Sequence, residues 1–234
     1  MVKFDSGRAT SQAVEDYLKA IYKLQSVTAP VTTSALAEKL GISAAAATKM
    51  LKQLDGMRLI SYVPYHGANL TDAGRRIALE VIRHHRLIEQ YLHQAMGYAW
   101  DQVDAEAEKL EHAISEEFEA RIDELLGYPE TCPHGDPIPR ADGVLVDERL
   151  QTLGECAAGD WVRIERVRDT DPAVLRDLTQ RQMGLHTQIF VSDRHSDNSL
   201  TILVAGTPHL VHEPISASVF VTPLTADQAP ANHG

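Results

Sequence analysis

The chain has 234 residues and a formal net charge of −11, a length that predicts one or two domains able to bury a core without cross-links. Its two cysteines exclude a disulfide framework and a repeated Cys-x-x-Cys zinc motif. The first residues lack an apolar signal core, and no apolar run approaches the length of a membrane span. We therefore expect a soluble, cytoplasmic protein that does not contact a membrane.

The charge is unevenly distributed along the chain. Residues 1–76 contain ten Lys and Arg against six Asp and Glu, whereas residues 77–127 contain four against twelve. Nucleic acids attract basic surfaces, so the acidic chain as a whole argues against nucleic-acid binding. The basic first third is nevertheless compatible with one nucleic-acid-binding domain joined to acidic partners.

The first third has the pattern of a helix-turn-helix. A helix is predicted over residues 11–25, with Ser11 as a candidate N-cap. Two short helices follow, one capped by Thr32 or Thr33 and ending at Leu40, the other from Ala44 to about Gly56. Gly41 can end the first of these, and Ser43 can cap the second. The second helix would enter the major groove. The residues predicted to lie near the bases and the DNA backbone are Ser43, Ala45, Ala46, Thr48 and Lys49.

A β-hairpin is predicted after these helices. Residues 59–63 and 67–71 have the composition of short strands and are separated by Pro64, Tyr65 and His66. A helix-turn-helix followed by such a hairpin is a winged helix. The alternative is a generic small helical bundle with an accidental turn.

Two long helices are predicted next, over residues 72–96 and 101–126. Their apolar faces exceed what a small domain can cover, which indicates a dimerisation unit. In the second helix, one stripe at helical spacing is apolar and predicted to face the core: Val103, Ala107, Leu110, Ile114 and Phe118. The stripe beside it is polar and contains Asp104, Glu108, Glu111, His112 and Ser115.

The polar stripe is a candidate metal site. Its three carboxylates and one imidazole repel one another or compete for protons, and a divalent cation compensates them compactly. Oxygen-rich ligands with an imidazole suit Mn²⁺ or Fe²⁺, and the absence of thiolate argues against Cu(I) and structural Zn²⁺. The alternative is a solvated acidic face.

The last part of the chain predicts a small β domain after a proline-rich connector at residues 131–139. Cys132 and His134 of the connector are possible metal ligands, although we favour a buried loop contact. Strands are predicted over residues 161–167, 189–191, 200–204 and 219–221, with a helix over 172–183. Short strands around one helix indicate a small barrel.

Four segments carry a resemblance to a known family: residues 15–22 (EDYLKAIY), 84–89 (HHRLIE), 108–112 (EKLEH) and 132–135 (CPHG). They resemble the diphtheria toxin repressor family of metal-dependent regulators, in particular its manganese-responsive members, over nearly the whole chain. The resemblance implies a mainly α fold with a small β domain. The implied parts are a winged helix-turn-helix (1–75), a helical metal-binding and dimerisation domain (76–140), an SH3-like barrel (141–225) and a mobile tail (226–234).

The same resemblance implies two metal sites. The primary site would contain Asp16, Glu108, Glu111 and His112. The ancillary site would contain His85, Glu89 and Asp104, with Asp171 reaching over from the barrel.

The chain departs from the iron-responsive pattern at several of these positions. Asp16 and Glu108 stand where iron-responsive members have Met and Cys, and Asp104 stands where they have His, so the donors are harder. Lys19 stands where two-domain manganese regulators have a ligand Glu, so their two-metal geometry is not assumed. Val174 stands where a Gln ligand often occurs, which leaves the contribution of the barrel open.

The expected function is a DNA-binding transcriptional regulator, most simply a repressor of metal-transport genes, and not an enzyme. Mn²⁺, with Fe²⁺ or another divalent transition metal as the alternative, would fix a homodimer for binding to a near-palindromic operator. Two other functions are considered: a dinuclear metallohydrolase or oxidase that uses the same carboxylates, and a winged-helix regulator that ignores metal.

Overall fold

The computed structural model describes residues 10–146, 148–168, 170–225 and 227–228, and its contacts divide the chain into two units. The first unit comprises the chain up to His84 together with residues 111–113 and 139–145. The second comprises residues 85–110, 114–138 and 146 onward. The second unit therefore contains most of the helical segment together with the C-terminal β domain. The three domain boundaries predicted at residues 75, 140 and 225 stay a prediction.

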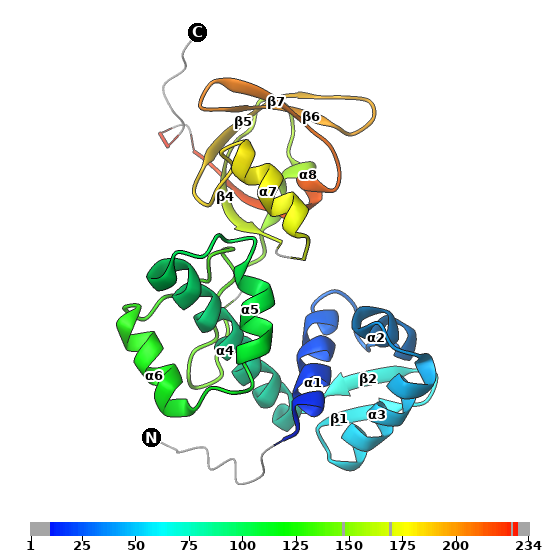
Figure 1. The fold of residues 1–234 in the computed structure, drawn as a ribbon. Helices are drawn as coiled ribbons and strands as arrows, with labels where there is room; N and C mark the ends of the chain where they lie inside the picture. Colours follow the sequence, from blue (N-terminus) through cyan, green and yellow to red (C-terminus); the bar gives the residue numbers. More distant parts are fainter. Residues whose placement is uncertain (1–9, 147, 169, 226, 229–234) are drawn as a thin grey trace. The chain divides into compact units, whose positions relative to one another are not determined.

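The first unit contains the predicted winged helix (Figure 1). Its elements are α1 (Gln12–Gln25), α2 (Thr33–Leu40), α3 (Ala44–Gly56), β1 (Ile60–Val63) and β2 (Gly67–Leu70), and the two strands pair antiparallel. Helices α1 and α3 pack on the hairpin through a shared apolar core in which Leu18, Leu51 and Leu54 are fully buried.

The turn between α2 and α3 has the predicted local chemistry. Gly41 has a φ of 63°, a left-handed conformation that costs glycine little, and it ends α2. The Ser43 hydroxyl accepts a hydrogen bond from the Ala46 backbone N–H at 3.2 Å and so caps α3. Ser11 occupies the N-cap position of α1, but its side chain makes no capping hydrogen bond.

The long helix α4 spans Asp72–Met96, as predicted. The acidic helix that follows differs from the prediction, because it is broken into α5 (Val103–Leu110) and α6 (Glu116–Leu125). The Ser115 hydroxyl accepts a hydrogen bond from the Phe118 backbone N–H at 3.2 Å, so it starts a new helix instead of continuing the old one.

The break also corrects the predicted apolar stripe. Val103 and Ala107 are fully buried and Ile114 packs against them, but Leu110 and Phe118 are 41% and 48% exposed. The stripe is buried at Val103 and Ala107 but already fails at Leu110, the last residue of α5, after which residues 111–115 leave the helical path.

The C-terminal part is an antiparallel sheet domain. Six strands lie in the order β3-β8-β4-β5-β6-β7. Their bounds are β3 Gln151–Thr152, β4 Trp161–Val167, β5 Gln188–Arg194, β6 Leu200–Val204, β7 Thr207–Val211 and β8 Val219–Pro223. Helix α7 (Pro172–Gln180) buries Leu175 and Leu178 in the sheet core, while the short η1 (Leu153–Glu155) and α8 (Ile215–Ser218) complete the domain (Figure 1).

Strand β7 was not predicted, because Pro208 interrupts its pattern. Proline cannot donate to a ladder and is tolerated at a sheet edge, which is where β7 lies. Helix α7 ends at Gln180, three residues before the predicted end. Apart from residues 227 and 228, the predicted mobile tail lies outside the described residues. No described helix combines the length and the apolar character needed to cross a membrane.

The cap at Ser115 gives a stability prediction. Ser115→Ala removes the acceptor of the Phe118 N–H and should lower the free energy of unfolding by about 1 kcal/mol. Urea unfolding followed by circular dichroism in the presence of a chelator measures this change. Ser34→Ala, at an exposed interior position of α2, is the matched control, and an equal effect of both substitutions would contradict the capping role.

Candidate metal centres and nucleic-acid interface

The first candidate metal centre lies in the first unit. Helix α1 presents Asp16, and the turn after α5 presents Glu111 and His112. The His112 Nε2 atom lies 2.8 Å from Asp16 Oδ1 and 3.3 Å from Glu111 Oε1. Two carboxylate oxygens and one imidazole nitrogen around one point form a donor set that suits a hard divalent cation. The break after α5 allows Glu111 and His112 to face α1 together.

Glu15 supports this cluster from the next position on α1. Its Oε2 atom lies 2.6 Å from His112 Nδ1. An ionised carboxylate can accept a hydrogen bond from an imidazole N–H, so with a metal on Nε2 the other ring nitrogen, Nδ1, would carry the hydrogen and donate it to Glu15. Analysis of the sequence did not identify Glu15, although it lies in the segment that carried the family resemblance.

Lys19 is the second neighbour that analysis of the sequence left without a role in the site. Its ammonium donates hydrogen bonds to both Glu111 carboxylate oxygens, at 2.8 and 2.7 Å, and both side chains are buried. The His84 Nδ1 atom lies 3.1 Å from the Glu111 backbone carbonyl oxygen. The Glu111 charge is therefore balanced by a fixed cation, which agrees with the prediction that a tightly coupled two-metal geometry should not be assumed.

The second candidate centre lies in the second unit and contains His85, Asp104 and Glu108. The His85 Nε2 atom is 3.2 Å from Asp104 Oδ1, and His85 Nδ1 is 3.6 Å from Glu108 Oε2. His85 is buried, whereas the carboxylates are about half exposed. The structure thus brings Glu108 to the predicted ancillary residues, and its role as a primary-site ligand stays a prediction.

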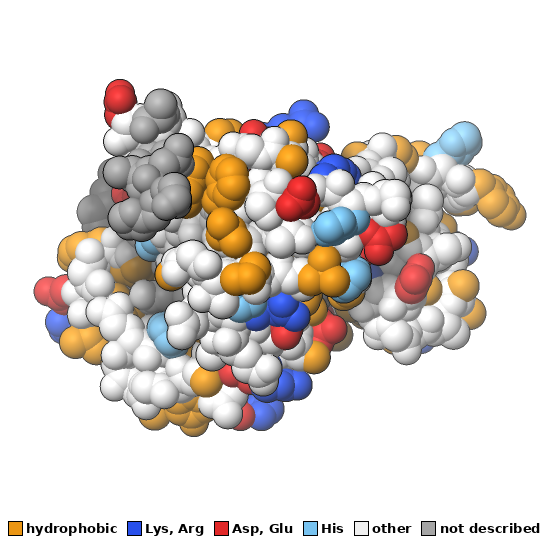
Figure 2. Space-filling model, turned by 90° about the horizontal axis from the view of Figure 1, so that it is seen from above, with side chains coloured by type: hydrophobic (Ala, Val, Ile, Leu, Met, Phe, Trp, Pro, Cys, Tyr) orange, Lys and Arg blue, Asp and Glu red, His pale blue; other side chains and the backbone are white. Residues whose placement is uncertain are grey.

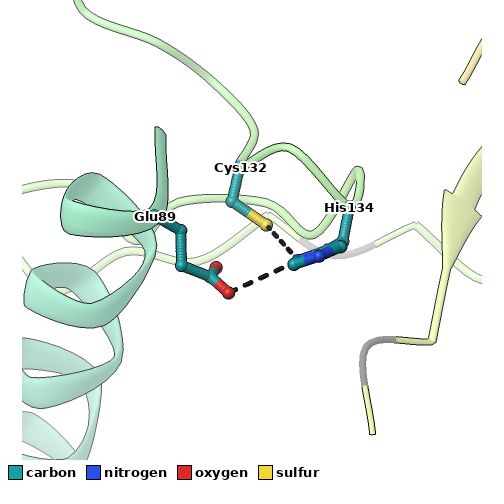
Figure 3. Close-up of side chains that lie close together, drawn as sticks. All are labelled: Glu89, Cys132 and His134. Carbon is teal, nitrogen blue, oxygen red and sulfur yellow. Dashed lines mark hydrogen bonds and ion pairs between the residues drawn. The ribbon is translucent and has the colours of Figure 1, made fainter. Parts of the chain in front are cut away.

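The third candidate centre is fully buried and contains Glu89, Cys132 and His134 (Figure 3). The His134 Nδ1 atom lies 3.4 Å from Glu89 Oε1 and 3.9 Å from Cys132 Sγ. The same Glu89 oxygen lies 3.5 Å from His85 Nε2, so Glu89 faces both the second and the third centre. Among the described residues it has ion-pair contacts but no hydrogen bond of good geometry. Cys132 and His134 lie in a buried loop, α4 supplies a third donor beside them, and the preference for a loop contact over a metal site stays a prediction.

The protonation of the third centre follows from burial. Burial opposes ionisation of Glu89, but the contacts with His134 and His85 outweigh it and hold the pKa of Glu89 well below its ordinary value. Burial, together with the nearby Glu89 and Asp136 carboxylates, raises the pKa of the Cys132 thiol. A metal would have to displace that thiol proton before Cys132 could act as a ligand.

Two residues of the C-terminal domain do not join these groups. Asp171 caps α7, because its Oδ1 accepts a hydrogen bond from the Ala173 backbone N–H at 2.8 Å. Val174 is buried in the sheet core. In the described part of the chain Asp171 belongs to none of the three clusters, so its predicted ligand role stays a prediction.

The candidate DNA interface is the exposed face of α3. Ser43, Ala45, Ala46 and Lys49 are exposed, and Thr48 is half-buried. The Thr48 hydroxyl donates to the Ala44 carbonyl at 2.8 Å, and the Ser43 hydroxyl caps the helix. Ser43 and Thr48, two of the five residues predicted to contact DNA, therefore already use their hydroxyls in hydrogen bonds to the backbone at the start of α3.

Charged side chains of both signs are mixed on the face of the molecule that Figure 2 shows. Among the described residues visible in Figure 2, Lys and Arg side chains are interspersed with Asp and Glu side chains instead of forming a patch of one sign. A nucleic-acid surface normally concentrates basic charge.

A winged helix with an exposed recognition helix, combined with carboxylate–histidine clusters on the following helices, defines a class of metal-binding DNA-binding proteins. Comparison with known proteins identifies the family. The model described as "Iron dependent repressor, N-terminal DNA binding domain" matches residues 9–68. The model described as "Iron dependent repressor, metal binding and dimerisation domain" matches residues 71–140.

Individual relatives agree with these matches. The iron-dependent repressor IdeR of Mycobacterium tuberculosis is 32% identical over 177 residues, which cover 73% of each chain. A solved structure of a manganese-dependent transcriptional repressor in complex with manganese is 37% identical, with a TM-score of 0.83 over 90% of this chain and 100% of the other. The structure of ScaR with bound Zn²⁺ is 31% identical, with a TM-score of 0.78 over 90% and 99%.

The chain belongs to the iron-dependent repressor family, whose members include the diphtheria toxin repressor of Corynebacterium jeikeium. The predicted family and fold class are confirmed. The family consists of metal-dependent DNA-binding repressors and not of enzymes, so the metallohydrolase alternative is set aside.

The buried Lys19–Glu111 pair gives a second stability prediction. Lys19→Met leaves the Glu111 charge buried without its ammonium partner and should lower the free energy of unfolding in chelator by roughly 3–5 kcal/mol. Added Mn²⁺ should restore more stability to this variant than to the parent, because the metal replaces the missing cation. Urea unfolding with and without Mn²⁺ measures both effects.

Lys109→Met is the matched control. Lys109 forms an exposed ion pair with Glu106 at 2.7 Å, and such a pair contributes at most about 1 kcal/mol. The prediction fails if the two Lys→Met variants lose equal stability, or if Mn²⁺ stabilises Lys19→Met no more than the parent.

Proposed function

We propose that this chain is a manganese-responsive repressor of metal-transport genes. In the proposal a divalent metal bound by Asp16, Glu111 and His112 holds a homodimer in the form that binds its operator. The observation that carries the proposal is the convergence of these three side chains from α1 and from the turn after α5. Asp16 of α1 and the Glu111–His112 pair of the turn after α5 must both be in place for the metal to bind. In the proposal the metal therefore fixes the orientation of α1 relative to that turn.

The choice of Mn²⁺ rests on the hardness of the donors. Asp16 and Glu111 supply oxygen, and oxygen ligands suit Mn²⁺ better than thiolate does. The Irving–Williams order means that Fe²⁺, Co²⁺ and Zn²⁺ should also bind in vitro, so selectivity would depend on geometry and on metal availability. The similarity to a manganese-dependent repressor and to ScaR with bound Zn²⁺ supports both parts of this view.

The other two clusters would act as ancillary sites. We assign His85, Asp104 and Glu108 to a second, half-exposed site for a hard cation, with Glu108 still a candidate ligand of the first. The buried cluster of Glu89, Cys132 and His134 contains a thiolate donor and suits a softer divalent metal such as Zn²⁺, Co²⁺ or Fe²⁺. Asp171 could join an ancillary site through Oδ2, because its Oδ1 is the oxygen that caps α7.

Metal binding of ordinary affinity is sufficient to switch DNA binding on and off. A site at tenfold over its dissociation constant stabilises the bound form by roughly 1.4 kcal/mol. Two such sites together would change DNA affinity about a hundredfold if the metal-free form does not bind. The operator would be near-palindromic, because a two-fold dimer presents two recognition helices about one helical turn or a multiple apart.

The test of the proposed function is a titration of DNA binding against Mn²⁺ and Fe²⁺ without oxygen. The probe is a fluorescent duplex selected from a random library in the presence of Mn²⁺, and the readout is anisotropy. The parent should bind with Mn²⁺ and release the duplex on addition of a chelator. Binding that is unchanged by the chelator would support a metal-independent regulator instead.

Substitution of single ligands sharpens this test. Asp16→Ala should lose the Mn²⁺ response, because it removes the only α1 ligand of the proposed centre. Glu108→Ala should also lose it if Glu108 completes the primary site, whereas a response like that of the parent would assign Glu108 to the His85 cluster alone. Glu117→Ala, an exposed carboxylate on α6, is the matched control and should respond normally, and a normal response from Asp16→Ala would reject the centre.

The DNA-binding face of α3 gives a separate prediction. Lys49 is exposed on this face, and Lys49→Ala should weaken binding in the presence of Mn²⁺. If Lys49 contacts phosphate, the slope of log affinity against log salt should fall by about 1. If it contacts a base, sequence preference should relax instead. Lys109→Ala, in the acidic segment, is the control, and equal binding by the two variants would remove Lys49 from the interface.

A further inference from the structure

His134 of the buried centre is held by its ring as well as by its backbone. Its Nε2 atom lies 2.7 Å from the Trp100 carbonyl oxygen. A carbonyl can only accept a hydrogen bond, so Nε2 carries a hydrogen, and Nδ1, which lies on the side of Glu89 and Cys132, is the nitrogen left to ligate a metal. The Trp100 backbone thus selects the tautomer that a metal at this centre requires.

Trp100 is in turn fastened to the C-terminal sheet domain. Its indole Nε1 donates a hydrogen bond to the Thr179 hydroxyl of α7 at 2.8 Å, and its ring packs against the core of that domain. The next residue, Asp101, forms an ion pair with Arg176 of α7 at 3.3 Å. The segment that orients the His134 ring is therefore anchored on α7.

The backbone of the His134 loop is fastened to the same domain. The Val167 N–H of β4 donates to the His134 carbonyl oxygen at 2.8 Å. A Cβ atom added at Gly135 would lie 2.1 Å from the Glu165 carbonyl oxygen, so the loop and β4 are in direct backbone contact. Both connections of His134 lead to the sheet domain, although none of the described side chains of that domain belongs to the Glu89, Cys132 and His134 group.

We propose that Trp100 is a positioning residue that couples this centre to the C-terminal domain, an inference that rests on the proposed metal-dependent function. Through Trp100, docking of α7 holds His134 ready for a divalent metal that accepts thiolate and imidazole ligands. Binding and docking are then reciprocal: the docked domain raises metal affinity, and the bound metal stabilises the docked domain to the same degree.

The variants of the test break the link without touching a ligand. Thr179→Val removes the acceptor of the Trp100 indole while keeping the side-chain shape. Thr179→Ser restores the hydroxyl. Thr187→Val is the matched control, because its hydroxyl donates within the sheet domain, to the Gln182 carbonyl oxygen. Cys132→Ser removes the thiolate donor.

Co²⁺ is the probe, because its thiolate charge-transfer absorption reports the Cys132 centre alone. The parent, Thr187→Val and Thr179→Ser should bind Co²⁺ with similar affinity at this band. Thr179→Val should bind roughly tenfold more weakly, the lower end of the range for groups that orient a metal ligand. Cys132→Ser should lose the band. Equal affinity of Thr179→Val and the parent, or absence of the band in the parent, would overturn the proposal.

A second readout follows the coupling in the opposite direction. In a Trp161→Phe background Trp100 is the remaining tryptophan, and Zn²⁺ should change its fluorescence and slow hydrogen exchange in α7. Neither change should occur in Cys132→Ser, and their persistence there would contradict the coupling. Mn²⁺-driven operator binding is measured on the same parent protein. Its absence would reject the proposed function, whereas the Co²⁺ comparison alone decides the role of Trp100.

Discussion

A buried negative charge at Glu111 is the constraint around which the first candidate centre is built. A carboxylate out of contact with water is costly unless cations and hydrogen bonds surround it. Lys19 supplies an ammonium in contact with both oxygens, and His112 lies on the other side. A metal at this point would therefore enter a site whose charge is already partly balanced. The proposed switch requires the metal to improve this arrangement by positioning Asp16, and not merely to neutralise Glu111.

In the second unit a buried carboxylate is compensated by imidazoles and not by an ammonium group. Its buried carboxylate, Glu89, faces two imidazoles, from His85 and His134, and a thiol that burial keeps protonated. These donors are softer than those of the first centre and lie away from water. The Asp16, Glu111 and His112 centre and the Glu89, Cys132 and His134 centre thus present donor sets of different hardness, which gives one chain the means to distinguish metals by site.

The winged helix could be predicted from the sequence because its signals are local. Gly41, Ser43 and the hairpin residues each act on their immediate neighbours, and the helices and strands lie where these residues indicated. The break between α5 and α6 could not be predicted in this way, because apolar and polar spacing continues across it. Ser115 was assigned to a stripe, whereas its hydroxyl starts a new helix.

The residues that meet in the candidate centres were only partly predictable, because they are far apart in the sequence and no local signal pairs them. Asp16 and His112 are 96 positions apart, and their pairing was inferred only from the family resemblance. Glu89 is 43 positions before Cys132, and no local pattern links them. Lys19 and Glu15 lie within one turn of Asp16, but their contacts with Glu111 and His112 depend on the path of the chain after α5.

The two ends of the C-terminal sheet limit how copies of this chain can associate. An exposed outer strand offers unpaired backbone groups to any second sheet, and proteins commonly avoid this by shortening the strand or placing proline in it. Here β3 has two residues, and β7 contains Pro208, which has no N–H to offer. Growth of the sheet by strand addition is therefore disfavoured at both ends. The risk of runaway β-polymerisation of the folded chain is reduced accordingly.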